Sequence, residues 1–136
     1  MITIVGLDFS SKKERAVLPD ELPGLLDSGL FFWVDIDCAH CPEKGPQCGR
    51  CEAILRTLRI SEVVMAEVLG PDREGRYDVY EDCLHFAVTE AKLYENRLQT
   101  AHVDVVLGLN YLVTYRRREA DFVKQARLDV QKLKDL

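Results

Sequence analysis

The chain has 136 residues and a formal net charge of −5, with 47% hydrophobic and 30% charged residues. This length and composition are typical of one soluble globular domain over residues 1–136, and they exclude a disordered or low-complexity chain. The negative charge disfavours nucleic acid as a partner, and we expect neither a secretion signal nor a membrane span from the apolar pattern.

The first part of the chain predicts a hairpin, a short helix and an interior strand. Residues 2–7 and 14–18 have the residue types of two short strands around a polar turn. Residues 19–26 favour a short helix, because acidic residues fall in its first turn and a glycine follows its end. The continuous apolar run 30–36 is typical of a buried strand.

The second part predicts two helices, a run of strands and a final helix. Helices are expected at 52–58 and 61–69, strands at 76–81, 83–93, 100–108 and 111–116, and a helix from 119 onward. In this last helix a narrow apolar stripe is formed by Val123, Ala126, Val130 and Leu133. The order of elements predicts an α+β (mixed α/β) fold, with a mixed, mainly antiparallel sheet flanked by helices.

The cysteines carry the clearest chemical signal in the sequence. Two Cys-x-x-Cys pairs lie close together, at Cys38 and Cys41 and at Cys48 and Cys51. Two such pairs can bring four thiolate sulfurs to one point, which is the ligand set of a structural zinc ion. Because four sulfurs fill the tetrahedron, no position remains for water or substrate. We therefore predict a structural zinc site in a cysteine-rich loop at 38–51 that pins a surface excursion.

Other interpretations of this loop remain open. An iron site of the rubredoxin type would use the same sulfurs, His40 would be an alternative ligand, and disulfides are a further option. A redox pair at Cys38 and Cys41 would require a helix after it, which Pro42 disfavours. Gly49 is expected in a turn around the metal that only glycine adopts without strain.

Several other residues are candidates for sites, each with a simpler interpretation. Glu95, expected at the tip between two strands, is a candidate magnesium ligand or a solvated loop residue. His85 and His102 could form a metal pair, although we expect both on the wetter face of the sheet. Arg116–Arg118 is expected to be a solvated turn, and Cys83 to pack as a small hydrophobic residue.

Four segments of the chain occur in an order and at a spacing that one known family shares. They are Gly29–Asp35 with its Trp-Val-Asp, Ile60–Leu69, Arg76–Phe86, and Leu107–Tyr115 with its Gly-Leu-Asn-Tyr-Leu-Val-Thr. In succession they resemble the conserved strands and helix of the CorA-type magnesium transporter family. The chain departs from that family in lacking the two membrane helices and the Gly-Met-Asn pore signature, and in carrying the cysteine cluster.

The resemblance implies a cytosolic regulatory and assembly domain of a magnesium or other divalent-cation transporter. Its partners would be further copies of itself, in a pentamer, and its own membrane domain, at the cytoplasmic face of the inner or plasma membrane. Mg²⁺ would be a regulatory ion, and neither nucleic acid nor a small-molecule substrate is expected. No enzyme is expected either, because the sequence contains no nucleophile elbow, phosphate loop or dinucleotide fingerprint. The alternatives are a freestanding zinc-stabilised interaction module and a thiol redox protein.

Overall fold

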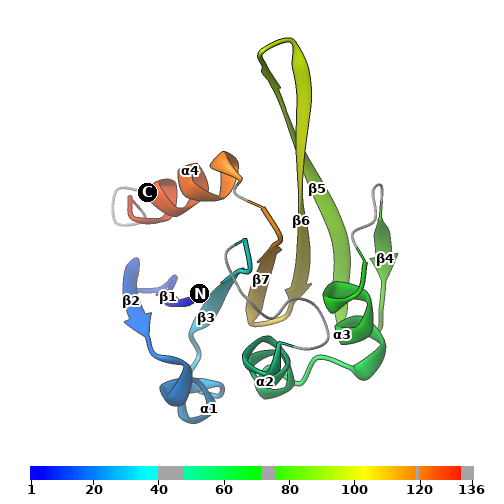
Figure 1. Cartoon of the computed structure of the whole chain (residues 1–136). Helices are drawn as coiled ribbons and strands as arrows, with labels where there is room; N and C mark the ends of the chain where they lie inside the picture. The colour runs from blue at the N-terminus through cyan, green and yellow to red at the C-terminus, as the bar shows by residue number, and fades with distance from the viewer. Residues whose placement is uncertain (40–47, 72–75, 119, 133–136) are drawn as a thin grey trace.

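The computed structural model describes residues 1–39, 48–71, 76–118 and 120–132 (Figure 1). Its strands are β1 Ile2–Asp8, β2 Lys13–Val17, β3 Phe31–Asp37, β4 Tyr77–Val79, β5 Cys83–Tyr94, β6 Arg97–Gly108 and β7 Tyr111–Arg116. Its helices are the 3₁₀ turn η1 Pro19–Glu21 and the α-helices α1 Leu22–Leu25, α2 Gly49–Thr57, α3 Glu62–Leu69 and α4 Asp121–Val130. None of the helices in these ranges is long and apolar enough to cross a membrane.

All the described strands belong to one seven-stranded sheet with the order β2-β1-β3-β7-β6-β5-β4. Neighbouring strands are antiparallel except β3 and β7, which run parallel near the middle of the sheet. The predicted mixed, mainly antiparallel sheet is therefore confirmed. The run predicted as a buried strand is β3, which is hydrogen-bonded on both sides, to β1 and to β7.

The main core lies between the sheet and the helices α1, α2 and α3 (Figure 1). Side chains alternate along a strand, so every second residue of β3 faces these helices. The fully buried residues of this layer include Phe32, Val34, Ile36, Leu55, Val64, Val68, Val106, Val113 and Tyr115. Near the carboxyl ends of β3 and β7, Ile36 and Tyr115 are thus buried in this layer.

The opposite face of the sheet is partly covered by α4. Val123 of this helix is buried in a second cluster with Trp33, Val103 and Val105, and Ala126 packs against the same cluster. The predicted apolar stripe is therefore confirmed up to Val130, while Leu133 lies outside the described residues.

Two local predictions require correction. Helix α2 begins at Gly49, directly after its N-cap Cys48, so Gly49 lies in a helical turn and not in a glycine-only turn around a metal. Gly29, with φ of 84°, is the glycine with positive φ in the described part of the chain. Strand β6 begins at Arg97 and not at the predicted residue 100. Glu95 and Asn96 form a tight turn with φ of 49° and 63°, so β5 and β6 remain paired up to the tip of the hairpin.

The β5–β6 hairpin extends beyond the rest of the sheet (Figure 1). Pairing of β6 with β7 starts at Val103, and pairing of β5 with β4 reaches only to Phe86. The ladder between β5 and β6 continues without other strands as far as Tyr94 and Arg97. We call residues 89–102 the hairpin arm. Its outer part exposes large apolar side chains, including Leu98, which is 70% exposed.

Candidate metal centre

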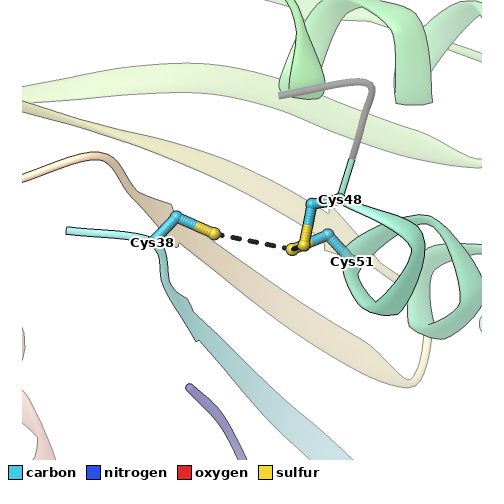
Figure 2. A group of neighbouring side chains, drawn as sticks. All are labelled: Cys38, Cys48 and Cys51. Carbon is cyan, nitrogen blue, oxygen red and sulfur yellow. Dashed lines mark hydrogen bonds between the residues drawn. The ribbon is translucent and has the colours of Figure 1, made fainter. Parts of the chain in front are cut away.

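Three cysteine sulfurs meet where β3 ends and α2 begins (Figure 2). The Sγ atoms of Cys38 and Cys51 are 3.5 Å apart, and those of Cys48 and Cys51 are 2.8 Å apart. All three sulfurs lie within 4.8 Å of one another. The structure therefore brings together three of the four predicted ligands, while Cys41 lies outside the described residues, as does His40.

The backbone fixes the direction of each of these side chains. Cys38 directly follows the last residue of β3, and its N–H donates a hydrogen bond to the carbonyl of Arg116, 2.8 Å away. Cys48 is the N-cap of α2, and Cys51 lies in the first turn of that helix. Residues three apart on a helix share one face, so both sulfurs point from α2 towards the end of β3. The Cys-x-x-Cys spacing of this second pair thus has a helical basis.

The three thiols are buried in the main core of the protein. Cys38, Cys48 and Cys51 are 1%, 4% and 1% exposed, and all three belong to the cluster formed with β3, β7 and α2. These three cysteines therefore lie in the core, while residues 40–47 of the loop that the ion is expected to pin lie outside the described residues. A metal bound here would join the sheet to α2 from inside the core, so its loss would affect the packing of both.

The geometry is compatible with a tetrahedral thiolate site. With Zn–S distances near 2.3 Å, neighbouring sulfurs of a tetrahedron are separated by about 3.8 Å. The Cys38–Cys51 separation of 3.5 Å is close to this value, whereas the Cys48–Cys51 separation of 2.8 Å is shorter and would open on binding. Burial, and then contact with the Cys48 and Cys38 thiols, raises the pKa of Cys51. A cation would offset that cost, because metal binding releases the thiol protons.

A tyrosine lies next to the sulfurs on the sheet side. Tyr115 of β7 is 1% exposed, and its pKa is raised by burial and then by its interaction with Cys38. The hydroxyl is therefore protonated and can donate a hydrogen bond to the Cys38 sulfur. Partners of this kind orient metal ligands and adjust their basicity.

An open space adjoins the site on the side of η1 and β1. A cavity of about 730 Å³ is bordered by the three cysteines, by Ile36 of β3 and by Arg50 of α2. A path by which an ion reaches the ligands is one of the requirements of a metal site, and this cavity provides one.

No disulfide joins Cys38, Cys48 and Cys51 to one another in the described part of the chain. Cys83 lies outside this cluster and is buried in the main core, as predicted. Burial raises the pKa of Cys83, and Asp82 adds to this effect. Cys83 therefore packs as a small hydrophobic residue. The proposed redox pair of Cys38 with Cys41 includes a residue outside the described ranges.

The two histidines considered as a metal pair are not brought together. Across the β5–β6 ladder, His85 pairs with Val106 and His102 pairs with Thr89, which places them four positions apart along the hairpin. Both are buried, so their predicted place on a wetter face is wrong. His85 Nε2 lies 2.7 Å from Asp104, and His102 Nδ1 lies 2.8 Å from the hydroxyl of Thr89.

The arginine run is also more buried than expected. Arg116 is 7% exposed and forms a two-point ion pair with Asp35, with N–O distances of 3.1 and 2.6 Å. Arg117 contacts Asp104 at 2.5 Å, so a solvated turn is a correct description only of the exposed Arg118. Glu95 is exposed at the tip of the hairpin arm, where the sequence placed it.

Solved structures share this fold over almost the whole chain. The cytoplasmic domain of ZntB from Vibrio parahaemolyticus matches 98% of the chain with a TM-score of 0.66 and 11% identity. Full-length CmaX matches 97% with a TM-score of 0.70 and 15% identity. The soluble domain of CorA from Methanocaldococcus jannaschii matches 97% with a TM-score of 0.61 and 16% identity. The chain has the fold of the CorA-type soluble domain.

The CorA-type fold accounts for part of each of these proteins. The chain spans 51% of the ZntB domain, 39% of CmaX and 46% of the CorA soluble domain. No family model matches the sequence. No curated protein matches it either. The likeness therefore rests on the fold and not on sequence identity.

Proposed function

We propose that the chain is a regulatory and assembly domain of a CorA-like transporter of magnesium or another divalent cation. The observation that supports this proposal is the match of 97–98% of the chain to the ZntB cytoplasmic domain and the CorA soluble domain. Residues 1–136 act as one domain at the cytoplasmic face of a membrane, next to a membrane domain of the same protein. The domain is non-catalytic, and its role is packing between neighbouring copies.

A divalent cation would act on such packing through surface carboxylates. The chain carries 23 Asp and Glu residues against 18 Lys and Arg residues, and Glu95 is exposed at the tip of the hairpin arm. Mg²⁺ binds through one or two carboxylates while retaining several waters, so it can link two acidic surfaces without a dedicated cage. Assembly into a pentamer that depends on Mg²⁺ follows from the proposal.

We further infer that Cys38, Cys41, Cys48 and Cys51 bind one structural zinc ion. The support is the convergence of three buried sulfurs in the structure, together with the position of Cys41 in the same pair of motifs. Zinc is preferred to iron because two paired Cys-x-x-Cys motifs are a typical ligand set of structural zinc sites. The ion would fasten α2 to the end of β3.

The transport proposal is tested by the coding sequence beyond residue 136 and by the assembly of the chain. We expect two apolar segments of about 20 residues in that extension. Native mass spectrometry with and without millimolar Mg²⁺ should show a pentamer that is more populated with the ion. A reading frame without apolar segments, together with a monomer at every Mg²⁺ concentration, would favour the freestanding zinc-stabilised module.

The zinc proposal is tested by metal analysis of freshly purified protein. We expect one zinc per chain and no thiol in the cluster that reacts with a thiol reagent before denaturation. A red protein would identify iron in the same ligand set. A metal-free sample with a reactive dithiol would support the redox alternative.

A further inference from the structure

The cysteine site is connected to the sheet through Tyr115. Tyr115 pairs with Ile36 in the β3–β7 ladder, and Cys38 lies two positions after Ile36 on the same face. The two side chains are therefore diagonal neighbours in a layer where each is 1% exposed. The hydroxyl of Tyr115 interacts with Cys38, a predicted metal ligand, and this interaction adds to burial in raising the pKa of Tyr115.

The ring of Tyr115 in turn contacts Arg117. The guanidinium carbon of Arg117 lies 4.9 Å from the centre of this ring, a distance at which a cation is attracted by the aromatic face. The same guanidinium donates to the carbonyls of Val68, at 2.6 Å, and of Gly70, at 2.8 Å. These carbonyls lie at the carboxyl end of α3. The last carbonyls of a helix receive no hydrogen bond from its own N–H groups, and this end of a helix favours a positive charge. Arg117 therefore attaches the last turn of α3 to the sheet.

A buried carboxylate fixes the position of Arg117. Asp104 is 6% exposed and accepts from Arg117 through one oxygen at 2.5 Å, while its other oxygen lies 2.7 Å from His85. His85 is fully buried, and its Nδ1 atom has no hydrogen-bond partner. Buried polar networks are sensitive to the loss of any member, so a change in the position of Arg117 affects both ends of this connection.

We propose that metal occupancy of the cysteine site determines how firmly the last turn of α3 is attached to the sheet, with Tyr115 and Arg117 as positioning residues. The proposal rests on the zinc site proposed above. A zinc-bound sulfur carries more negative charge than a thiol, so it accepts a stronger hydrogen bond from Tyr115 and orients the ring beneath Arg117. The remainder of α3 is held by buried residues such as Val64 and Met65, so the effect is local.

Hydrogen–deuterium exchange of the whole chain, zinc-loaded and zinc-depleted, tests this connection. We expect the amides of the last turn of α3 to exchange at least about fivefold faster after depletion, which is the lower range of known couplings between sites. Peptides from the β1–β2 hairpin are the internal reference and should change less. Measured zinc content accompanies each sample.

Two variants make the test specific. Tyr115→Phe removes only the hydroxyl, so it should still bind zinc, more weakly, while exchange in α3 loses its response to zinc. Arg117→Gln should expose the end of α3 with zinc present and, because coupling is reciprocal, should lower zinc affinity by the factor by which zinc protects α3. Arg118→Gln is the matched control, since that neighbouring arginine is exposed, and it should behave as the unchanged protein.

The outcomes separate this inference from the zinc proposal. A chain that binds one zinc but shows the same α3 exchange with and without it would overturn the connection and leave the zinc site intact. Faster exchange of all peptides to the same extent would also overturn it, because zinc would then act on the whole fold. A chain that binds no zinc would overturn both.

Discussion

The sheet has two regions that differ strongly in burial. One is the hairpin arm, and the other, which we call the cysteine corner, is formed by Cys38, Cys48 and Cys51 where β3 and β7 end. At the corner, the ends of β3 and β7 are covered by α2, and the three described thiols are at most 4% exposed. In the arm, β5 and β6 pair only with each other, and Leu93 and Leu98 are 74% and 70% exposed. A two-stranded hairpin is only marginally stable in water by itself, so the arm depends on the rest of the sheet.

The candidate metal ligands that the structure describes thus lie in the buried region of the sheet and not in the exposed one. They lie at the ends of regular elements inside the core, where packing fixes the positions of their side chains. Exposed apolar residues on a projecting ribbon add little to folding of the chain. We therefore expect changes at the corner to alter the fold, and changes in the arm to leave the isolated chain nearly unaffected.

The largest expected effect is that of Cys51→Ser. Structural zinc contributes an apparent binding energy of roughly 10–16 kcal/mol in finger peptides, and this cysteine also fills the core. We expect loss of bound zinc and a fall of at least about 10 °C in the thermal unfolding midpoint, measured by calorimetry. Cys83→Ser is the matched control, because it is a buried cysteine outside the cluster. It should retain zinc and lose about 1 kcal/mol. Equal effects of the two changes would contradict the account.

The next largest effect is expected for the ion pair between Asp35 of β3 and Arg116 of β7. Asp35→Ala removes the closer partner of Arg116 and leaves, among the described residues, only Asp37, at 3.5 Å, so it should lower the free energy of unfolding by about 2 kcal/mol in urea titrations. The loss should be partly recovered in the double variant Asp35→Leu with Arg116→Met, since both charges are then absent. If the double variant were less stable than the single one, the pair would have another role.

A smaller effect is expected in the arm. Leu98→Gln should change the free energy of unfolding by less than about 0.5 kcal/mol, because this side chain is already exposed. The measurement is again a urea titration. A loss of 2 kcal/mol or more would show that the arm is packed in solution, and the contrast with the corner would fail.

The smallest effect concerns the contact between the arm and α4. Lys92 of β5 forms an ion pair with Asp121, and this hydrogen bond lowers the pKa of Asp121 below its ordinary value of 3.8. A carboxyl with a lowered folded pKa stabilises the fold at pH values above its unfolded pKa and loses this contribution as the pH falls through the folded value. The protection factors of the amides in the first turn of α4, which are corrected for the intrinsic pH dependence of exchange, should therefore be constant above about pH 5 and fall only in acid. Asp121→Asn should abolish this dependence, and an unchanged acid response would exclude the pair as its cause.

The elements of the fold were predictable where periodicity was strong. The continuous apolar run of β3 and the apolar stripe of α4 gave their positions directly. The start of α2 was missed because Cys48 and Gly49 are not typical residues at the start of a helix. The spacing of Cys48 and Cys51 was an available signal, since residues three apart lie on one face of a helix. The extension of β6 was missed because residues 97–100 are polar apart from the single apolar Leu98, as expected for a ribbon that does not join the core.

The residues around the candidate site were less predictable. The spacing of the cysteines identified the cluster, but nothing local indicated that Tyr115 and Arg117 lie beside it, because their neighbours come from distant parts of the chain. The burial of Arg116 had one available signal, the Asp35 within the apolar run of β3, since a charge in a buried strand requires a partner. The pairing of β3 with β7 supplies that partner.

The most direct test of the account is X-ray absorption at the zinc edge on protein purified without added metal. We expect one zinc per chain with four sulfur neighbours at about 2.3 Å. Protein that is free of metal, or zinc surrounded by nitrogen and oxygen, would contradict the claim that these cysteines form a metal centre within the core.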